Sequence, residues 1–160
     1  MKQASTLFLK VVLIILGGLV MAFCIFAIPM MSRGVGIEWP QLTHLKYPIL
    51  IGGYLTALPF FVALYQAFKL LTYIDRSIAF SDVSVRALRS IKYCGITMSI
   101  LYAASTPIVF QIAEADDAPG AVLFWMLFAL APAIVAVFAA VLQKLVENAI
   151  DIKSENDLTV

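Results

Sequence analysis

The feature that most constrains this chain is a set of four apolar runs, each about 20 residues long or longer. The runs cover residues 11–31, 47–71, 93–113 and 121–142. A helix of about 20 apolar residues crosses the ~30 Å hydrocarbon core of a bilayer. None of the runs alternates in polarity over about ten residues, as the strands of an outer-membrane barrel do. The pattern predicts four membrane-spanning helices.

Composition supports the same class. Apolar residues make up 62% of the chain and charged residues 13%, against roughly 45–50% and about 25% in typical soluble domains. A soluble domain of this size could not bury so much apolar surface. The formal net charge of +1 provides no field that would attract nucleic acid. These values exclude a soluble enzyme domain, a disordered chain and direct nucleic-acid binding.

The basic residues predict the orientation. Nine of the 11 Lys and Arg residues lie at the two chain ends and around the connection between the second and third runs. Only Arg33 and Lys46 lie in the first loop, and the third loop has none. Because Lys and Arg are enriched in cytoplasmic loops, we expect a multi-pass plasma-membrane protein with both termini in the cytoplasm.

Short connections make successive helices antiparallel, so the expected fold is all-α. It is an integral membrane up-down four-helix bundle that forms a single domain over residues 1–160. Small residues at helical spacing predict close packing of the fourth helix, and prolines within the runs predict kinks. The small residues are Ala129, Ala133, Ala136 and Ala140, and the prolines are Pro59, Pro107 and Pro132.

Helices two, three and four are expected to extend into the cytoplasm. Ser81 is predicted to cap the third helix, with Phe80 packed on Val85. Basic residues then recur at a spacing of three and form one stripe, which either marks the cytoplasmic side and attracts anionic lipid or docks an acidic protein surface. The stripe consists of Arg86, Arg89 and Lys92.

Residues 143–160 are predicted to form a helical extension that ends in a mobile tail from residue 154. An apolar stripe continues along this extension and needs a cover, which could be the third helix, the lipid surface or a partner. Gln143 and Glu147 are expected to face away from the stripe. The stripe residues are Leu145, Val146, Ala149 and Ile150.

The second outer loop carries three carboxylates, Glu114, Asp116 and Asp117. They could attract a cation or a cationic peptide. They could equally form a solvated loop in which Asp117 caps the fourth helix.

Polar side chains concentrate on the second and third spans. Tyr65, Gln66, Tyr102 and Gln111 could line a small polar pocket. The alternative is that they form interhelical hydrogen bonds, worth about 0.6 kcal/mol each.

Groups for catalysis are scarce. The single histidine, His44, lies in an outer loop, and the spans contain no carboxylate. The sequence has no HExxH motif, no CxxC motif and no phosphate-binding glycine loop. We therefore expect no catalytic residues, no metal site and no cofactor, and a protein that is not an enzyme.

Five segments together resemble a bacterial domain-of-unknown-function family, number 2975, of small four-helix membrane proteins. The resemblance implies a neighbour, because genes of this family often lie beside one for a very small Cro/C1-type helix-turn-helix regulator. It implies no functional residues. The segments are ALYQAFKLL at residues 63–71, AFSDVSVRAL at 79–88, IKYC at 91–94, AVFAAVLQK at 136–144 and IDIKSENDLTV at 150–160.

Three functions remain open at this point. The first is a non-enzymatic protein that tethers the small regulator through its cytoplasmic face. The second is an immunity or stress protein against cationic peptides, and the third is a small-molecule carrier that uses the polar pocket. The expected partners are the lipid bilayer, the regulator and, in a homodimer, a second copy of the chain.

Overall fold

The computed structural model describes residues 2–159, and within that range every regular element is a helix. The first half of the chain forms α1 (Lys2–Ala22), the π-helical turn η1 (Phe23–Ala27), α2 (Ile28–Glu38) and the 3-10 helix η2 (Pro40–Leu45). The second half forms α3 (Lys46–Asp75), α4 (Asp82–Ala104), α5 (Thr106–Ala115) and α6 (Gly120–Thr159).

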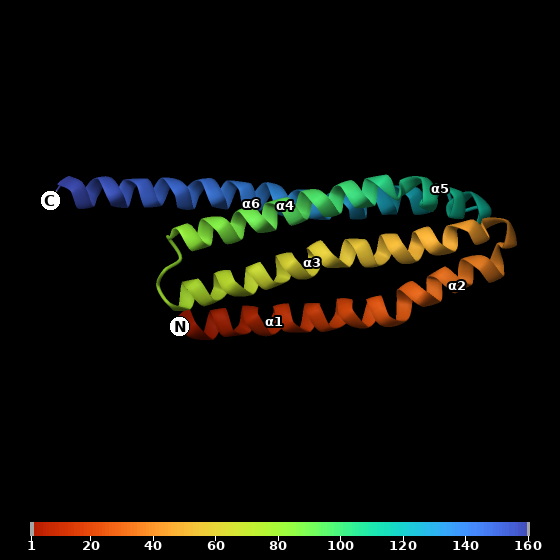
Figure 1. The fold of residues 1–160 in the computed structure, drawn as a ribbon, viewed down its shortest axis with the longest axis horizontal. Helices are drawn as coiled ribbons and strands as arrows, with labels where there is room; N and C mark the ends of the chain where they lie inside the picture. Colours follow the sequence, from red (N-terminus) through yellow and green to blue (C-terminus); the bar gives the residue numbers. More distant parts are fainter. Residues whose placement is uncertain (1, 160) are drawn as a thin grey trace.

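These elements combine into four antiparallel helical stretches (Figure 1). Each is long and apolar enough to cross a membrane, and each contains one of the four apolar runs. The predicted all-α four-helix membrane bundle is therefore confirmed. The stretches are Gln3–Glu38, Pro40–Asp75, Asp82–Ala115 and Gly120–Thr159.

Both chain ends and the 76–81 turn lie at one end of the bundle, on the left in Figure 1. We call it the basic end, because nine of the 11 basic residues lie toward it. The cytoplasmic location of this end remains a prediction from the charge pattern.

Successive helical stretches pack against one another in chain order, and the most extensive contact is between α4 and α6. Gly95 allows that contact. A Cβ atom at Gly95 would lie 2.6 Å from the Pro132 carbonyl oxygen and 3.0 Å from the Ala136 Cβ. Ala136 and Ala139 are buried there, so small residues bring the two helices together, as predicted.

Of the three prolines that were predicted to kink their helices, one lies beside an interruption of the helix. Pro59 and Pro132 lie inside continuous helices, whereas the third stretch divides at Ser105 into α4 and α5, just before Pro107. The π-helical turn η1 in the first stretch ends two residues before Pro29, which has no amide hydrogen to donate to the preceding turn.

The carboxyl end of α6 differs from the expectation. Helical backbone continues to Thr159 instead of giving way to a tail at residue 154. Residues 151–159 are all exposed, and the helix projects beyond the 76–81 turn (Figure 1). Mobility of this segment remains a prediction.

Candidate functional site

The basic stripe lies on the outer face of α4 near the basic end. Arg86 and Arg89 are exposed, whereas Lys92 is half-buried with its Nζ 4.9 Å from the centre of the Tyr93 ring. The Arg89 Nη2 atom lies 3.9 Å from Glu147 Oε1 on α6. The structure therefore leaves Arg86 as the stripe residue that is farthest from the membrane and has no described ion pair.

The start of α4 is formed differently from the prediction. Ser81 does occupy the N-cap position, but its Oγ donates to the Ile78 carbonyl oxygen (2.6 Å) and makes no cap hydrogen bond. Phe80 is 65% exposed, while Val85 is buried. Ser84, Ala87 and Leu88 are buried on the face opposite the stripe and hold this part of α4 in place.

The extension of α6 presents two faces. Val146 and Ile150 are half-buried, on the side that carries the α4 contact. Leu145 is 58% exposed, and Ala149 is half-buried. The predicted apolar stripe is therefore divided between a covered and an open face.

Gln143 was expected to face away from the apolar stripe of the extension, but it lies on the covered side of α6 together with the stripe residues Val146 and Ile150. The residue is buried between α4 and α6, in the helical series that begins with Ala136 and Ala139. Its Nε2 donates to Glu147 Oε1 (2.9 Å), and its Oε1 has no hydrogen-bond partner among the described residues. The spacing of four from Ala139 was the sequence signal for this position.

Sequence reasoning also missed a polar contact between α1 and α3 at the basic end. The Lys10 Nζ lies 2.5 Å from Asp75 Oδ2, and the Thr6 hydroxyl donates to Asp75 Oδ1. These hydrogen bonds, first from Lys10 and then from Thr6, hold the pKa of the Asp75 carboxyl below its usual value. Both charged residues were visible in the sequence, but nothing in their spacing indicated that they meet.

The acidic residues at the opposite end lie on the turn between α5 and α6. Glu114, Asp116 and Asp117 are all exposed. Asp117 adopts φ 51° and terminates α5, since the next amide, of Ala118, donates to the Ala113 carbonyl oxygen (2.8 Å). Asp117 therefore forms the turn at the end of α5. It does not occupy the N-cap position of the fourth helix that the sequence predicted, because α6 begins at Gly120.

The four residues of the predicted polar pocket lie at different levels of the bundle. Tyr65 lies under Lys69 Nζ (4.8 Å), and Gln66 is the next residue along α3. Tyr102 packs edge-on against Trp125 (5.4 Å between ring centres). Gln111 Oε1 lies 3.3 Å from His44 Nε2 near the opposite end. The structure does not bring these four side chains together.

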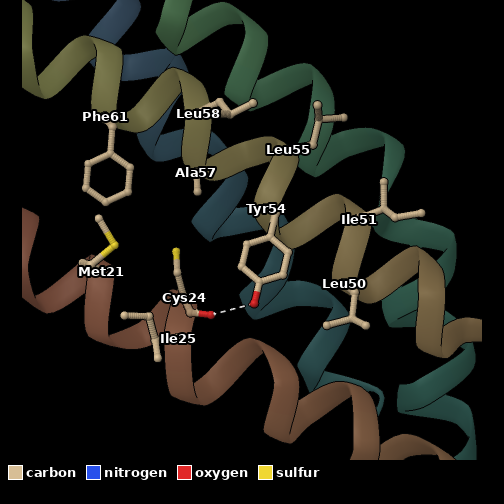
Figure 2. A pocket seen from close by; sticks show the side chains of 10 residues that line it. All are labelled: Met21, Cys24, Ile25, Leu50, Ile51, Tyr54, Leu55, Ala57, Leu58 and Phe61. Carbon is tan, nitrogen blue, oxygen red and sulfur yellow. Dashed lines mark hydrogen bonds between the residues drawn. The ribbon is translucent and has the colours of Figure 1, made fainter.

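Two open hollows on the surface of the bundle lie elsewhere. One, of about 600 Å³, opens between η1 and α3, and Figure 2 shows its apolar lining. Its one described hydrogen bond runs from the Tyr54 hydroxyl to the Cys24 carbonyl oxygen (3.2 Å). The other, of similar size, lies along residues 25–37 and includes Arg33. Neither contains a residue of the predicted pocket.

Metal-ligand chemistry has no obvious centre in the described range 2–159. No group of three or more His, Cys, Asp or Glu side chains is close enough to hold a metal ion there. The remaining candidate for a functional site is a surface. The most extensive helix contact, between α4 and α6, continues to the basic end and forms such a surface there.

Comparison with known proteins gives two matches. A family model described as "Protein of unknown function (DUF2975)" matches residues 36–160. The uncharacterized membrane protein YoaS of Bacillus subtilis (strain 168) is 52% identical over 160 residues, which is 100% of both chains. No solved structure matches.

Proposed function

The chain belongs to the DUF2975 family of proteins of unknown function, and we propose that it is a non-enzymatic plasma-membrane tether for a small helix-turn-helix regulator. The regulator would bind to the cytoplasmic face. The alternatives based on a cationic peptide or a carried small molecule have no specific observation in their favour beyond the exposure of the acidic turn.

The observation that carries the proposal is a pair of helices that stands clear of the predicted membrane. α4 begins at Asp82, 11 residues before the expected start of its span at residue 93, which corresponds to about 16 Å of helix. α6 runs beside it and continues farther. Together they form the proposed platform outside the bilayer, where Leu88 and Gln143 are buried and Arg89 Nη2 lies 3.9 Å from Glu147 Oε1.

Distance from the membrane separates the two interpretations of the basic stripe. Lys92 lies at the expected membrane boundary, where a positive charge fixes orientation and contacts lipid. Arg86 lies six residues farther out, about 9 Å along the helix. The headgroup layer is about 5–8 Å thick on each side, so the Arg86 backbone lies beyond it and the exposed guanidinium can turn toward an acidic protein surface.

Apolar area beside this charge completes an interface. Phe80, in the turn that leads into α4, is 65% exposed, and a specific interface combines an apolar centre with a charged rim. The resemblance noted in the sequence implies the partner, because the family's genes often lie beside one for a very small regulator. A membrane-bound platform would keep such a regulator away from DNA.

Co-purification tests the proposal with the full-length protein in mild detergent. The regulator encoded beside the gene should co-purify with the wild type, and Arg86→Glu should abolish this. Arg86 is the informative position because it is exposed and has no described ion pair, so its reversal leaves the α4–α6 contact intact. Asp116→Lys, a charge reversal of equal size and opposite sign at the opposite end, is the control. Absence of the regulator from the wild-type complex overturns the proposal.

A further inference from the structure

One face of α6 has a seven-residue repeat that the fold leaves open. Residues along it are spaced alternately by three and four, which is the spacing of the a and d positions of a coiled coil. We call this set the α6 seam. It consists of Val135, Phe138, Leu142, Leu145, Ala149, Ile152, Asn156 and Thr159.

The seam is distinct from the face that packs on α4. The buried residues of α6 are Ala136, Ala139 and Gln143, and each precedes or follows a seam residue by one position. Since neighbouring positions on a helix differ by about 100°, the seam points away from α4. Its large apolar side chains are accordingly exposed, from 49% at Leu142 to 65% at Phe138.

Lipid cannot cover the outer half of the seam. α6 has 40 residues and is about 60 Å long, twice the hydrocarbon thickness. Ile152 lies 10 residues beyond the expected end of the span, about 15 Å along a straight helix. It is 60% exposed there, well beyond the headgroup layer.

The exposed end of α6 lacks packing on any other element. Residues 151–159 are exposed throughout. The terminal turns of a helix gain little stability without a packed apolar face, because most helical stability in proteins comes from such packing. A cover for the seam would supply that packing.

We infer that the α6 seam is the contact of a parallel homodimer, in which α6 of a second copy forms a two-stranded coiled coil that runs from the membrane into the cytoplasm. Copies inserted by the same charge rule share one orientation, so their α6 helices are necessarily parallel where they meet. Asn156 occupies an a position, where a single Asn favours the in-register parallel dimer.

The charges that flank the seam are compatible with this pairing. In a parallel coiled coil, a residue at g faces the e position five residues later on the partner helix. Asn148 would therefore face Lys153, and Glu155 would face position 160. No like charges meet. Arg86 lies on α4 and outside the seam, so the dimer would present the proposed regulator surface twice.

Cysteine crosslinking tests the inference in isolated membranes. Single cysteines are placed from residue 144 to residue 156 in the full-length Cys24→Ser, Cys94→Ser protein and treated with a mild oxidant. Identical core positions of an in-register parallel pair come within disulfide reach. Crosslinking to twice the monomer mass should therefore peak at four positions and fall to background at four others. The peaks are expected at Leu145, Ala149, Ile152 and Asn156, and the background at Lys144, Glu147, Asp151 and Ser154.

A charge placed in the seam provides the second arm. Ile152→Asp should abolish the crosslink at Leu145→Cys, whereas Ser154→Asp, on the opposite face of the same turn, should leave it intact. Both positions are exposed in the monomer, so neither change affects its packing. Uniform crosslinking, no crosslinking, or adducts only of another mass overturns the homodimer.

Discussion

The Lys10 Nζ lies 2.5 Å from Asp75 Oδ2 and joins the first helix to the end of α3. The same Nζ lies 5.6 Å from the centre of the Phe68 ring. Lys10 is therefore neutralised within the fold, although the sequence alone counts it with the basic residues of the cytoplasmic side. The contact also anchors α1, which packs less extensively on α3 than α4 does on α6.

Stability should depend on the charge of Asp75 at low pH. The hydrogen bonds from Lys10 and Thr6 lower the pKa of Asp75 from its usual 3.8, so the carboxylate stabilises the fold above that pH. This contribution is lost as the pH falls through the folded-state pKa. The thermal midpoint of the wild type should exceed that of Asp75→Asn at neutral pH, and the difference should shrink below pH 3.8. A difference that stays constant into acid contradicts the ion pair.

Gly95→Ala should destabilise the bundle. A Cβ there would lie 2.6 Å from the Pro132 carbonyl oxygen, and such overpacking costs about 1–3 kcal/mol. Gly18→Ala is the matched control, because a Cβ at Gly18 meets nothing within 4 Å. It should be neutral or stabilising by up to about 1 kcal/mol, the difference in helix propensity. Unfolding free energies in the same detergent test both, and equal effects would contradict the close contact.

Gln143 should be replaceable by an apolar residue of similar size. Its buried Oε1 has no hydrogen-bond partner among the described residues, which costs about 1–3 kcal/mol, and this offsets the Nε2 bond to the Glu147 carboxylate, which contributes about 1.5–3 kcal/mol. Gln143→Leu should therefore leave the unfolding free energy unchanged or raise it. Gln143→Ala should lower it, since it leaves a cavity. A large loss of stability in Gln143→Leu would show that the amide has a partner.

The sequence was sufficient for the number of helices and their antiparallel order. A run of about 20 apolar residues has few alternatives to a membrane helix, and the short 76–81 turn leaves α3 and α4 antiparallel. The small residues also predicted a close helix contact, which Ala136 and Gly95 make. These features depend on local composition and spacing.

Contacts between side chains on different helices could not be predicted from local composition and spacing. Gln143 is polar but lies on the buried face, because the rotation of α6 is set by Gly95 and the alanines opposite it. The Lys10–Asp75 pair joins residues 65 positions apart. The predicted polar pocket grouped side chains of the second and third spans because all of them are polar. In the structure, Tyr65 and Gln111 lie at different heights along the bundle, beside Lys69 and His44 respectively.

Orientation can be checked by labelling cysteines in intact cells with a membrane-impermeant maleimide. In the Cys24→Ser, Cys94→Ser protein, Asp116→Cys should react directly, because it is exposed on the turn opposite the basic end. Ser154→Cys should react only after permeabilisation, since the distribution of Lys and Arg places that end in the cytoplasm. The reverse pattern would place the platform outside the cell and remove the basis for a cytoplasmic partner.

The central claim, that the platform at the basic end holds a regulator at the membrane, is tested most directly by locating that regulator in living cells. A fluorescent fusion of the small regulator encoded beside the gene should outline the membrane in wild-type cells. It should become diffuse or bind the nucleoid in cells that carry Arg86→Glu, and it should stay at the membrane in the Asp116→Lys control. A regulator that is equally diffuse in all three strains would contradict the account.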